Sequence, residues 1–299
     1  MKVLISDGMA KAAIQDLKDN GFEVTEQFYP PEELVKEIEK YDVIVVRSAT
    51  KVTKEIIAAG KNLKLIVRGG VGIDNIDSAA AKEHSVKVMN TPAASSASVA
   101  ELALAHIFAI ARFLPQATGS MKAGQWEKKA FAKGMELGGK TLGLIGCGRI
   151  GIELAKRCKA LEMKVLAYDK FATINSPYVE QVDLETILTK SDVISLHIPL
   201  PKGEPPVIGA SEIAKMKNGA ILVNCARGGT VDEAALIEAL KSGKLRGAGV
   251  DVFVGEPSFN KDLVALPNVS VTPHIGASTV EAQDKVGAEV VSILIKELK

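Results

Sequence analysis

A glycine-rich stretch in the middle of the chain constrains its fold more than any other feature. Residues 141–151 read TLGLIGCGRIG, an apolar run that ends in Gly146, Gly148 and Gly151 at the spacing GxGxxG. At such a site a strand turns sharply into a helix, the backbone approaches a phosphate without a Cβ in the way, and the helix packs closely on the sheet. The N–H groups and the dipole at the start of that helix attract anions. The stretch therefore predicts a βα turn that binds the pyrophosphate of a dinucleotide.

A second strand-like run and an acid complete this pattern. The run of residues 164–168 is followed directly by Asp169, which lies 23 positions beyond Gly146. That spacing is close to the ~20 positions expected of the acid that binds the ribose. A carboxylate accepts hydrogen bonds from two ribose hydroxyls and repels a 2′-phosphate, so Asp169 favours NAD over NADP, although Lys170 offsets part of the repulsion. A tight turn in an unrelated α/β protein is the alternative, which the full βαβ context disfavours.

Size and composition exclude several classes of protein. The chain has 299 residues, which exceeds the size at which a single hydrophobic core usually stops growing. Its length therefore predicts two domains. Lys and Arg number 37 against 36 Asp and Glu, so no global charge attracts nucleic acid or an anionic membrane. The three cysteines are an odd number without CxxC spacing, which argues against a disulfide framework and a zinc site. We expect no metal and a reducing, cytoplasmic environment.

No segment is typical of export or of a membrane span. The N-terminus MKVLISD runs directly into a strand pattern, without the charged leader, apolar segment and cleavage site of a signal peptide. The most lipid-like stretch, residues 97–111, is too short to cross a bilayer and contains Glu101 and His106. We predict a buried helix there.

Short runs rich in Val and Ile alternate with helix-like segments along the chain. The first series of predicted strands covers residues 3–5, 43–46, 65–67 and 86–89, with helices predicted at 31–40 and 54–59. The second series covers residues 142–145, 165–168, 193–196, 220–223, 247–252 and 269–271. Such alternation is typical of parallel sheets and predicts an α/β protein with two doubly wound parallel-sheet domains.

Two longer helices complete the predicted organisation. Ser98 and Glu101 predict a capping box at the start of a helix that runs toward Leu114. This helix is apolar on almost every side and needs cover from the domain junction or from a second subunit. Residues 279–298 are amphipathic, with apolar residues at every fourth position, and we predict that they fold back onto the first domain.

Three residues able to do chemistry follow three predicted strands of the second series. Arg227 follows ILVNCA, Glu256 follows GAGVDVF in a GEP turn, and His274 follows VSVTP. Ligands of an open α/β sheet bind outside the carboxyl ends of its strands, where residues distant in sequence meet. We therefore expect these three side chains to form one site.

The three residue types suit the oxidation of a hydroxyacid. Histidine titrates near pH ~6.5, so it can remove a hydroxyl proton as the carbon loses a hydride. A carboxylate beside it favours the imidazolium, and an arginine binds a substrate carboxylate through two parallel hydrogen bonds. Taken singly, Arg227 is equally well interpreted as a surface charge, while Glu256 is better interpreted as a turn acid and His274 as a structural histidine; only their joint placement favours catalysis. We interpret His84, His106 and His197 as structural.

Eight motifs, in order along the chain, carry a resemblance to one family. They are RSATKVT from Arg47, RGGVGIDNID from Arg68, NTP from Asn90, SVAEL from Ser98, GCGRIG from Gly146, NCARGG from Asn224, DVF followed by EP, and PHIGAST from Pro273. Over nearly its whole length the chain resembles the D-isomer-specific 2-hydroxyacid dehydrogenases, and among them the members that oxidise D-3-phosphoglycerate. The chain departs from the family at Gly69, where alanine is common, and at Ala94 and Ser95, where a Gly-Asn pair is frequent.

The resemblance implies a domain arrangement and a set of site residues. A flavodoxin-like substrate domain, residues 1–94 plus 281–299, surrounds an inserted Rossmann NAD-binding domain, residues 95–280, and a homodimer forms through the long helix region. The catalytic residues implied are Arg227, Glu256 and His274. The residues assigned to NAD are Val71, Gly146, Gly148, Arg149, Ile150, Gly151, Asp169, Cys225, Ala226, Arg227, Asp251, His274, Gly276 and Ala277. The residues assigned to the substrate are Arg47, Ser48, Arg68, Gly69, Gly70, Arg227 and His274.

The loop that begins at Gly69 also has support from its own residues. Gly69, Gly70 and Gly72 follow a predicted strand and can present backbone N–H groups to a substrate carboxylate. A simple turn is the alternative for this loop.

The activity implied is NAD-dependent oxidation of D-3-phosphoglycerate to 3-phosphohydroxypyruvate, the first step of serine biosynthesis. The substrate phosphate needs cations, for which Arg47, Lys51 and Arg68 are candidates, with Lys128 or Lys129 across a dimer. Two alternatives stay open: a dehydrogenase for another D-2-hydroxyacid, such as glycerate, hydroxypyruvate or glyoxylate, and an NAD-sensing transcriptional corepressor. Longer family members carry regulatory domains after the last helix, whereas this sequence ends soon after it. We therefore expect no feedback by serine through such a domain.

Overall fold

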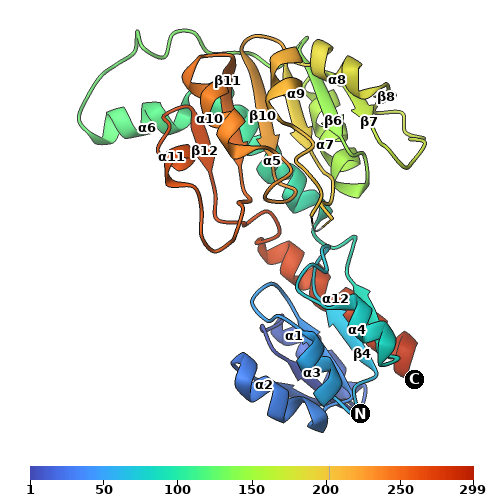
Figure 1. The fold of residues 1–299 in the computed structure, drawn as a ribbon. Helices are drawn as coiled ribbons and strands as arrows, with labels where there is room; N and C mark the ends of the chain where they lie inside the picture. Colours follow the sequence, from blue (N-terminus) through green and yellow to red (C-terminus); the bar gives the residue numbers. More distant parts are fainter. Residues whose placement is uncertain (202) are drawn as a thin grey trace. The chain divides into compact units, whose positions relative to one another are not determined.

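Two parallel sheets organise the chain (Figure 1). The structure is a computed structural model that describes residues 1–201 and 203–299. Its contacts divide the chain into a first unit, residues 1–95 and 277–299, and a second unit, residues 96–276. Each unit holds one sheet, so the α/β fold class predicted from the alternating pattern is confirmed.

The first unit is built on five parallel strands in the order β2-β1-β3-β4-β5. The strands are β1 (Lys2–Ile5), β2 (Glu23–Glu26), β3 (Val43–Val46), β4 (Leu65–Arg68) and β5 (Lys87–Asn90). This is the flavodoxin-like strand order 2-1-3-4-5, in which the order of the strands reverses between β1 and β3. β3 reads VIVV and is buried throughout, because helices cover both faces of a doubly wound sheet.

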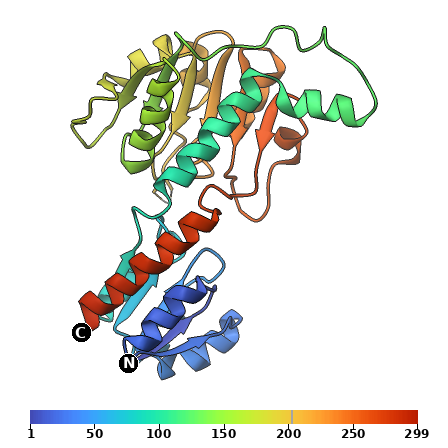
Figure 2. The same cartoon turned by 180° about the vertical axis from the view of Figure 1, so that it is seen from behind.

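Helices cover both faces of this sheet. One face packs on α1 (Lys11–Asp19) and α12 (Val280–Leu298), whose Val286, Val290 and Leu294 lie in the same core as Val3. Figure 2 shows α12 running along the sheet of this unit. The predicted return of the last helix to the first domain is therefore confirmed. The other face packs on α2 (Pro31–Glu37), the 3₁₀ turn η1 (Ile38–Lys40), α3 (Lys54–Ala59) and α4 (Ser78–Glu83).

The second unit is built on seven parallel strands in the order β12-β11-β10-β9-β6-β7-β8. They are β6 (Thr141–Ile145), β7 (Lys164–Tyr168), β8 (Glu180–Gln181), β9 (Val193–Leu196), β10 (Ala220–Asn224), β11 (Leu245–Val250) and β12 (Val269–Val271). The chain leaves β6 toward β7 and later returns to pair β9 with the other side of β6. The carboxyl ends of β6 and β9 therefore form the switch point at which Rossmann folds bind dinucleotides.

Two layers of helices enclose the second sheet. One layer contains α5 (Ser96–Ala111) and α7 (Arg149–Ala160), and α6 (Leu114–Lys122) follows α5 after a short break. The opposite layer contains α8 (Leu184–Lys190), α9 (Ala210–Lys215), α10 (Glu233–Lys241) and α11 (Lys261–Val264). In Figure 2, α5 crosses the face of this sheet as one long helix.

The start of α5 corrects one prediction. The helix begins at Ser96, so Ser98 lies inside its first turn and is not its N-cap. Glu101 does not close a capping box either, since its carboxylate pairs with Arg157 of α7 at 2.6 Å. Glu101 instead connects α5 to α7.

The predicted burial of residues 97–111 holds for one side of α5. Val99, Ala100, Ala103, Ile107 and Ile110 lie in the core beneath the sheet. Within the described residues, no single helix is long and apolar enough to cross a membrane, and α5 and α6 meet such a test only as a pair bent by 64°.

Candidate active site

The glycine loop between β6 and α7 gives each of its three glycines a different role. Gly146 has a φ of +84°, and a Cβ there would lie 2.6 Å from the carbonyl oxygen of His197. A Cβ at Gly151 would lie 2.9 Å from the carbonyl oxygen of Gly146, so the helix packs closely on the loop. Gly148 is exposed and has no atom within 4 Å of the position of a Cβ. The loop thus leaves open the one position at which a phosphate can approach the backbone, and these residues fit a dinucleotide.

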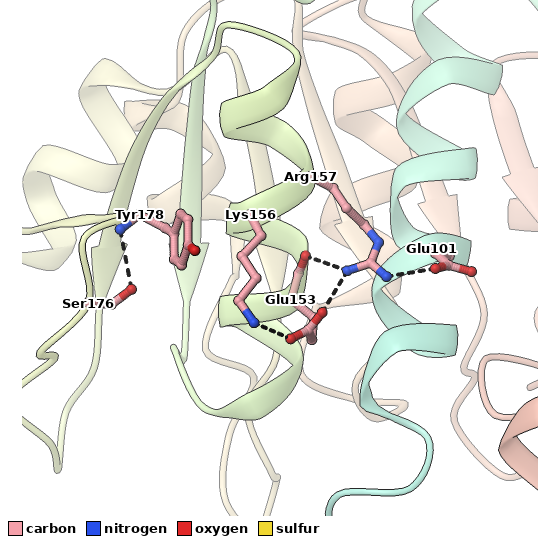
Figure 3. Close-up of polar contacts among 6 residues, drawn as sticks. All are labelled: Glu101, Glu153, Lys156, Arg157, Ser176 and Tyr178. Carbon is pink, nitrogen blue, oxygen red and sulfur yellow. Dashed lines mark hydrogen bonds and ion pairs between the residues drawn. The ribbon is translucent and has the colours of Figure 1, made fainter. Parts of the chain in front are cut away.

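Helix α7, whose N-terminus faces this loop, is tied to α5 by a charged network (Figure 3). Arg157 lies 2.8 Å from Glu153 on its own helix and 2.6 Å from Glu101 on α5, while Lys156 lies 2.6 Å from Glu153. Lys156 also lies 5.9 Å from the centre of the Tyr178 ring. Isolated surface ion pairs contribute little, but a shared network between two helices restricts how α7 can shift.

Asp169 lies at the end of β7, beside the glycine loop. One carboxylate oxygen accepts the N–H of Cys147 at 3.1 Å, and the other accepts the N–H groups of Phe171 and Ala172 at 3.0 and 3.1 Å. Burial tends to raise the pKa of Asp169, but these three donors hold it below its usual range. The acid predicted to bind the ribose is thus ionised and directed to the loop that would hold the pyrophosphate.

The turn after β10 holds Arg227 in a fixed backbone conformation. The Asn224 amide donates to the carbonyl oxygen of Arg227 at 3.0 Å, and the Thr230 hydroxyl donates to the same oxygen at 2.8 Å. A Cβ at Gly228 would overlap the carbonyl oxygen of Phe253, so this turn packs directly on the segment that leads to Glu256. Asn224 and Thr230 were not predicted as site residues, although a buried Asn at the end of a strand is a signal for such a role.

Glu256 and His274 meet, as the sequence predicts. The Glu256 carboxylate accepts from His274 Nδ1 at 2.6 Å, and its other oxygen accepts the N–H of Phe253 at 2.8 Å. Burial tends to raise the pKa of Glu256, but these two hydrogen bonds and the charges of His274 and Arg227 hold it below its usual range. Glu256 is therefore a carboxylate that can only accept, so Nδ1 carries the proton and Nε2 is free to take another.

The turn that carries His274 is held by Asp251, a residue predicted to contact NAD. The Asp251 side chain is only 1% exposed, and its oxygens accept the N–H groups of Ile275 and Gly276 at 2.8 and 2.9 Å. His274 has a φ of +53°, which is rare for a residue with a side chain. A contact between Asp251 and NAD stays a prediction.

In the first unit, the loop after β3 holds Arg47. Asp7 accepts the N–H groups of Arg47 and Thr50 at 2.7 and 3.0 Å. The Arg47 guanidinium donates to the side chain of Gln283, whose amide donates to the carbonyl oxygen of Ala277 at 3.1 Å. Burial lowers the pKa of Arg47, and the charge of Asp7 opposes this effect. Gln283 was not predicted from sequence, because nothing in a helix pattern indicates which polar residue faces a distant arginine.

The loop after β4 uses two of the backbone N–H groups that were predicted to bind a substrate carboxylate. The N–H of Gly69 donates to the carbonyl oxygen of Val46 at 2.8 Å, and that of Gly70 donates to the carbonyl oxygen of Arg68 at 2.9 Å. Binding of a substrate carboxylate by the backbone of this loop stays a prediction. A Cβ at Gly70 would overlap the Arg68 guanidinium, so this glycine lets the arginine fold across its own loop. Contacts of the substrate with the side chains of this loop stay predictions.

The remaining predicted residues divide by exposure. Ser48 and Arg149 are exposed and Val71 is 36% exposed, whereas Cys225 and Ala226 are buried. Ile150 lies in the first turn of α7. Burial raises the pKa of Cys147 to about 11 and also raises that of Cys225, so neither thiol is a ready nucleophile.

The other histidines have the surroundings of structural residues. His106 is 2% exposed and hydrogen-bonded through both ring nitrogens, and burial lowers its pKa. His197 lies 3.0 Å from the Ser195 hydroxyl, and burial lowers its pKa to about 4. His84 follows α4 as its C-terminal cap residue. Among residues 1–201 and 203–299, no group of three acidic, histidine or cysteine side chains could hold a metal ion.

Comparisons with known proteins place this arrangement in a family. Residues 104–276, more than half of the chain, match the family model of the D-isomer specific 2-hydroxyacid dehydrogenase, NAD binding domain. The chain belongs to this family. It is an NAD-dependent oxidoreductase, and the matched segment is its NAD-binding domain.

Individual relatives cover almost the whole chain. It is 53% identical to a hydroxypyruvate reductase of Thermotoga maritima, over 99% of this chain and 98% of that protein. It is 49% identical to a D-3-phosphoglycerate dehydrogenase of Archaeoglobus fulgidus, over 100% of this chain but 58% of that protein. A solved structure, the TT0316 protein of Thermus thermophilus, superposes with a TM-score of 0.90 at 35% identity, covering 99% of this chain and 96% of that one.

Proposed function

We propose that the chain oxidises D-3-phosphoglycerate at C2 to 3-phosphohydroxypyruvate with NAD, and so supplies the carbon skeleton of serine in the cytoplasm. The observation that carries the proposal is the hydrogen bond of 2.6 Å between Glu256 and His274, beside the turn of Arg227 in an NAD-binding domain. Similarity to D-3-phosphoglycerate dehydrogenases supports the choice of substrate.

His274 acts as the base in this proposal. Its Nδ1–H donates to Glu256, so the lone pair on Nε2 accepts the proton of the C2 hydroxyl. The imidazolium that forms is stabilised by the ionised Glu256, which the Phe253 N–H keeps in place. Bound NAD supplies the hydride acceptor.

Arg227 binds the substrate carboxylate. A guanidinium offers two parallel N–H donors to a carboxylate, which fixes the orientation of C2 and polarises the carbonyl that develops there. Its backbone is fixed by Asn224 and Thr230, so the side chain starts from a defined position. We assign NAD to the glycine loop and Asp169, and the anionic groups of the substrate to Arg47 and Arg68 of the first unit.

A second candidate function is supported by the identity of one relative. The hydroxypyruvate reductase of Thermotoga maritima is 53% identical to this chain, against 49% and 47% for the two archaeal D-3-phosphoglycerate dehydrogenases. Reduction of hydroxypyruvate to D-glycerate uses the same carboxylate site and the same histidine, which then donates a proton to the carbonyl oxygen, but it needs no cation for a phosphate. The two candidates therefore differ in what Arg47 and Arg68 do.

A substrate screen distinguishes the candidates. NADH absorbance is followed with D-3-phosphoglycerate and D-glycerate in one direction, and with hydroxypyruvate and glyoxylate in the other. We expect kcat/KM for D-3-phosphoglycerate to exceed that for D-glycerate by about tenfold or more, because only the phosphorylated acid gains charge-assisted hydrogen bonds from Arg47 and Arg68. A preference for the unphosphorylated acids supports the second candidate. Tight NAD binding with no turnover of any hydroxyacid supports an NAD sensor.

The base is tested by His274→Ala. We expect turnover to fall by ~10²- to 10⁴-fold, because general base catalysis contributes that much, while the Kd for NAD changes little. Calorimetric titration with NAD is the control for the folded site. Near-normal turnover in this variant would show that another group takes the proton.

We propose further that the protein is a homodimer joined through α6 and the segment that follows it. Leu114, Met121 and Trp126 are 52%, 57% and 78% exposed, an unusual number of large apolar side chains for one short stretch of surface. Sedimentation should give twice the 31.6 kDa mass of one chain. Replacing Met121 and Trp126 together with lysine should give the monomer mass, and an unchanged dimer would place the interface elsewhere.

A further inference from the structure

A chain of hydrogen bonds connects α5 to the turn that carries His274. The Ser270 hydroxyl lies 2.9 Å from His106 Nδ1, and His106 Nε2 lies 3.1 Å from the Thr272 hydroxyl. The Thr272 hydroxyl lies 2.6 Å from the Asp251 carboxylate. His106 and Asp251 are 2% and 1% exposed, and Ser270 and Thr272 are half-buried, so these bonds are largely shielded from water.

The chemistry of the groups gives this chain one direction. A carboxylate only accepts, so the single hydroxyl proton of Thr272 is donated to Asp251. Thr272 must therefore accept from His106, which places the imidazole proton on Nε2. Because burial lowers the pKa of His106, the ring is neutral and its Nδ1 accepts from Ser270. The donors run from Ser270 through His106 and Thr272 to Asp251.

Asp251 connects this chain of hydrogen bonds to the turn that carries His274. Its main-chain carbonyl accepts the N–H of His274 at 2.8 Å, and its side chain accepts the N–H groups of Ile275 and Gly276. Three successive N–H groups of the turn thus bind one residue. A histidine at a φ of +53° keeps that conformation only where its neighbours impose it.

The surrounding backbone leaves room for the buried ring. A Cβ at Gly249 on β11 would overlap the Cβ of His106, so this glycine allows α5 to bring the imidazole up to the sheet. A Cβ at Gly276 would lie 3.1 Å from the Asp251 carboxylate, so the turn also approaches closely. The network has the space that it needs on both sides.

We propose that Thr272, supported by His106, is a positioning residue for the reaction: it fixes Asp251 so that the turn 274–276 holds the His274 ring against Glu256. The proposal rests on the proposed role of His274 as the base. It adds that residues on α5 and β12, which do not touch the substrate, determine how well that base is placed.

The test combines Thr272→Val with His274→Ala. Valine keeps the shape of threonine and removes the hydroxyl that donates to Asp251. In single turnovers with NAD and the best hydroxyacid of the screen, we expect Thr272→Val to lower the rate of NADH formation roughly tenfold, since a small misplacement of a catalytic group has effects of this size. KM for NAD should change less than twofold, and Thr272→Ser, which restores the hydroxyl, should recover the rate.

The same substitution in the His274→Ala background separates positioning from general damage. If Thr272 acts through His274, Thr272→Val should change the residual rate of that variant less than twofold. An equal tenfold loss in both backgrounds would overturn the proposal. So would a Thr272→Val variant whose single-turnover rate is unchanged, whether or not its affinity for NAD is reduced. Failure of the base assignment is seen separately, as near-normal turnover of His274→Ala alone.

Two further variants guard the interpretation. Ile187→Val shortens a fully buried side chain of α8 in the same unit, outside the network, and should lower the melting temperature without changing the rate. If Thr272→Val does not fold, His106→Leu removes the donor to Thr272 from the other side. In the wild-type background, His106→Leu should lower the single-turnover rate about two- to threefold, and in the His274→Ala background it should have no such effect. An equal loss in both backgrounds would again overturn the proposal.

Discussion

At the scale of single residues, the three fingerprint glycines are equivalent in sequence but not in structure. Gly146 needs its positive φ and its contact with the His197 carbonyl, and Gly151 needs its contact with the loop backbone. Gly148 has ordinary backbone angles, with a φ of −73°, and open space around it. Contacts within the fold therefore require two of these glycines, whereas Gly148, at the N-cap of α7, has no contact that excludes a side chain.

This difference gives opposite expectations for two alanine variants. Gly146→Ala should lower the free energy of unfolding by ~2 kcal/mol or more, because it adds a strained φ and an overlap with a carbonyl. Gly148→Ala should change stability by less than ~0.5 kcal/mol. It should still raise the Kd for NAD about tenfold or more, because its Cβ occupies the space of the phosphate. Thermal unfolding and calorimetric titration measure the two effects, and an unchanged Kd in Gly148→Ala would show that the pyrophosphate does not approach there.

The sequence could predict the contact of Glu256 with His274 but not the support behind it. Both residues follow parallel strands, and parallel strands end at one edge of a sheet, so their meeting follows from topology. The chain of His106, Thr272 and Asp251 depends on which face of α5 meets the sheet and on how β11 and β12 pair. Such pairings between distant segments leave no mark on local periodicity. The partner of the Gly69 N–H was not predictable for the same reason, since the carbonyl oxygen that accepts it belongs to Val46 on β3.

At the scale of elements, predictions succeeded where a strand is buried on both faces. β3 and β9 are buried throughout and were predicted with their observed bounds. The edge strands β2, which reads EVTE, and β8, which reads EQ, are polar and were not predicted. A strand at an edge has one unpaired side and exposed side chains, so its sequence resembles that of a loop.

The ends of elements were less predictable than their existence. β11 was expected at residues 247–252 and lies at Leu245–Val250. The apolar run continues past the last paired residue because Val252 and Phe253 enter the core from the following loop. In α5, likewise, Glu101, whose spacing from Ser98 favours a cap, contacts Arg157 of α7. Side chains at the end of an element are selected by what the next segment packs against.

At the scale of the whole molecule, the titration of buried groups couples stability to pH. The chain has three cysteines, Cys147, Cys158 and Cys225, and all are free and buried. Burial raises the pKa of Cys147 to about 11 and that of Cys158 to about 12, and it raises that of Cys225 as well. A thiolate cannot be accommodated at these positions without losing its hydration.

The sign of the effect follows from where the protons are bound. Above pH ~9 the thiols of the unfolded chain lose their protons, whereas those of the folded chain keep them until the pH reaches their raised pKa values. The unfolded state then binds fewer protons, so the free energy of unfolding falls as pH rises, by up to ~1.4 kcal/mol per pH unit for each thiol. Denaturant unfolding between pH 8 and pH 10.5 should show this loss. Cys158→Ala should reduce the slope by the share of one thiol, and a slope that does not change in this variant would show that other groups cause the alkaline destabilisation.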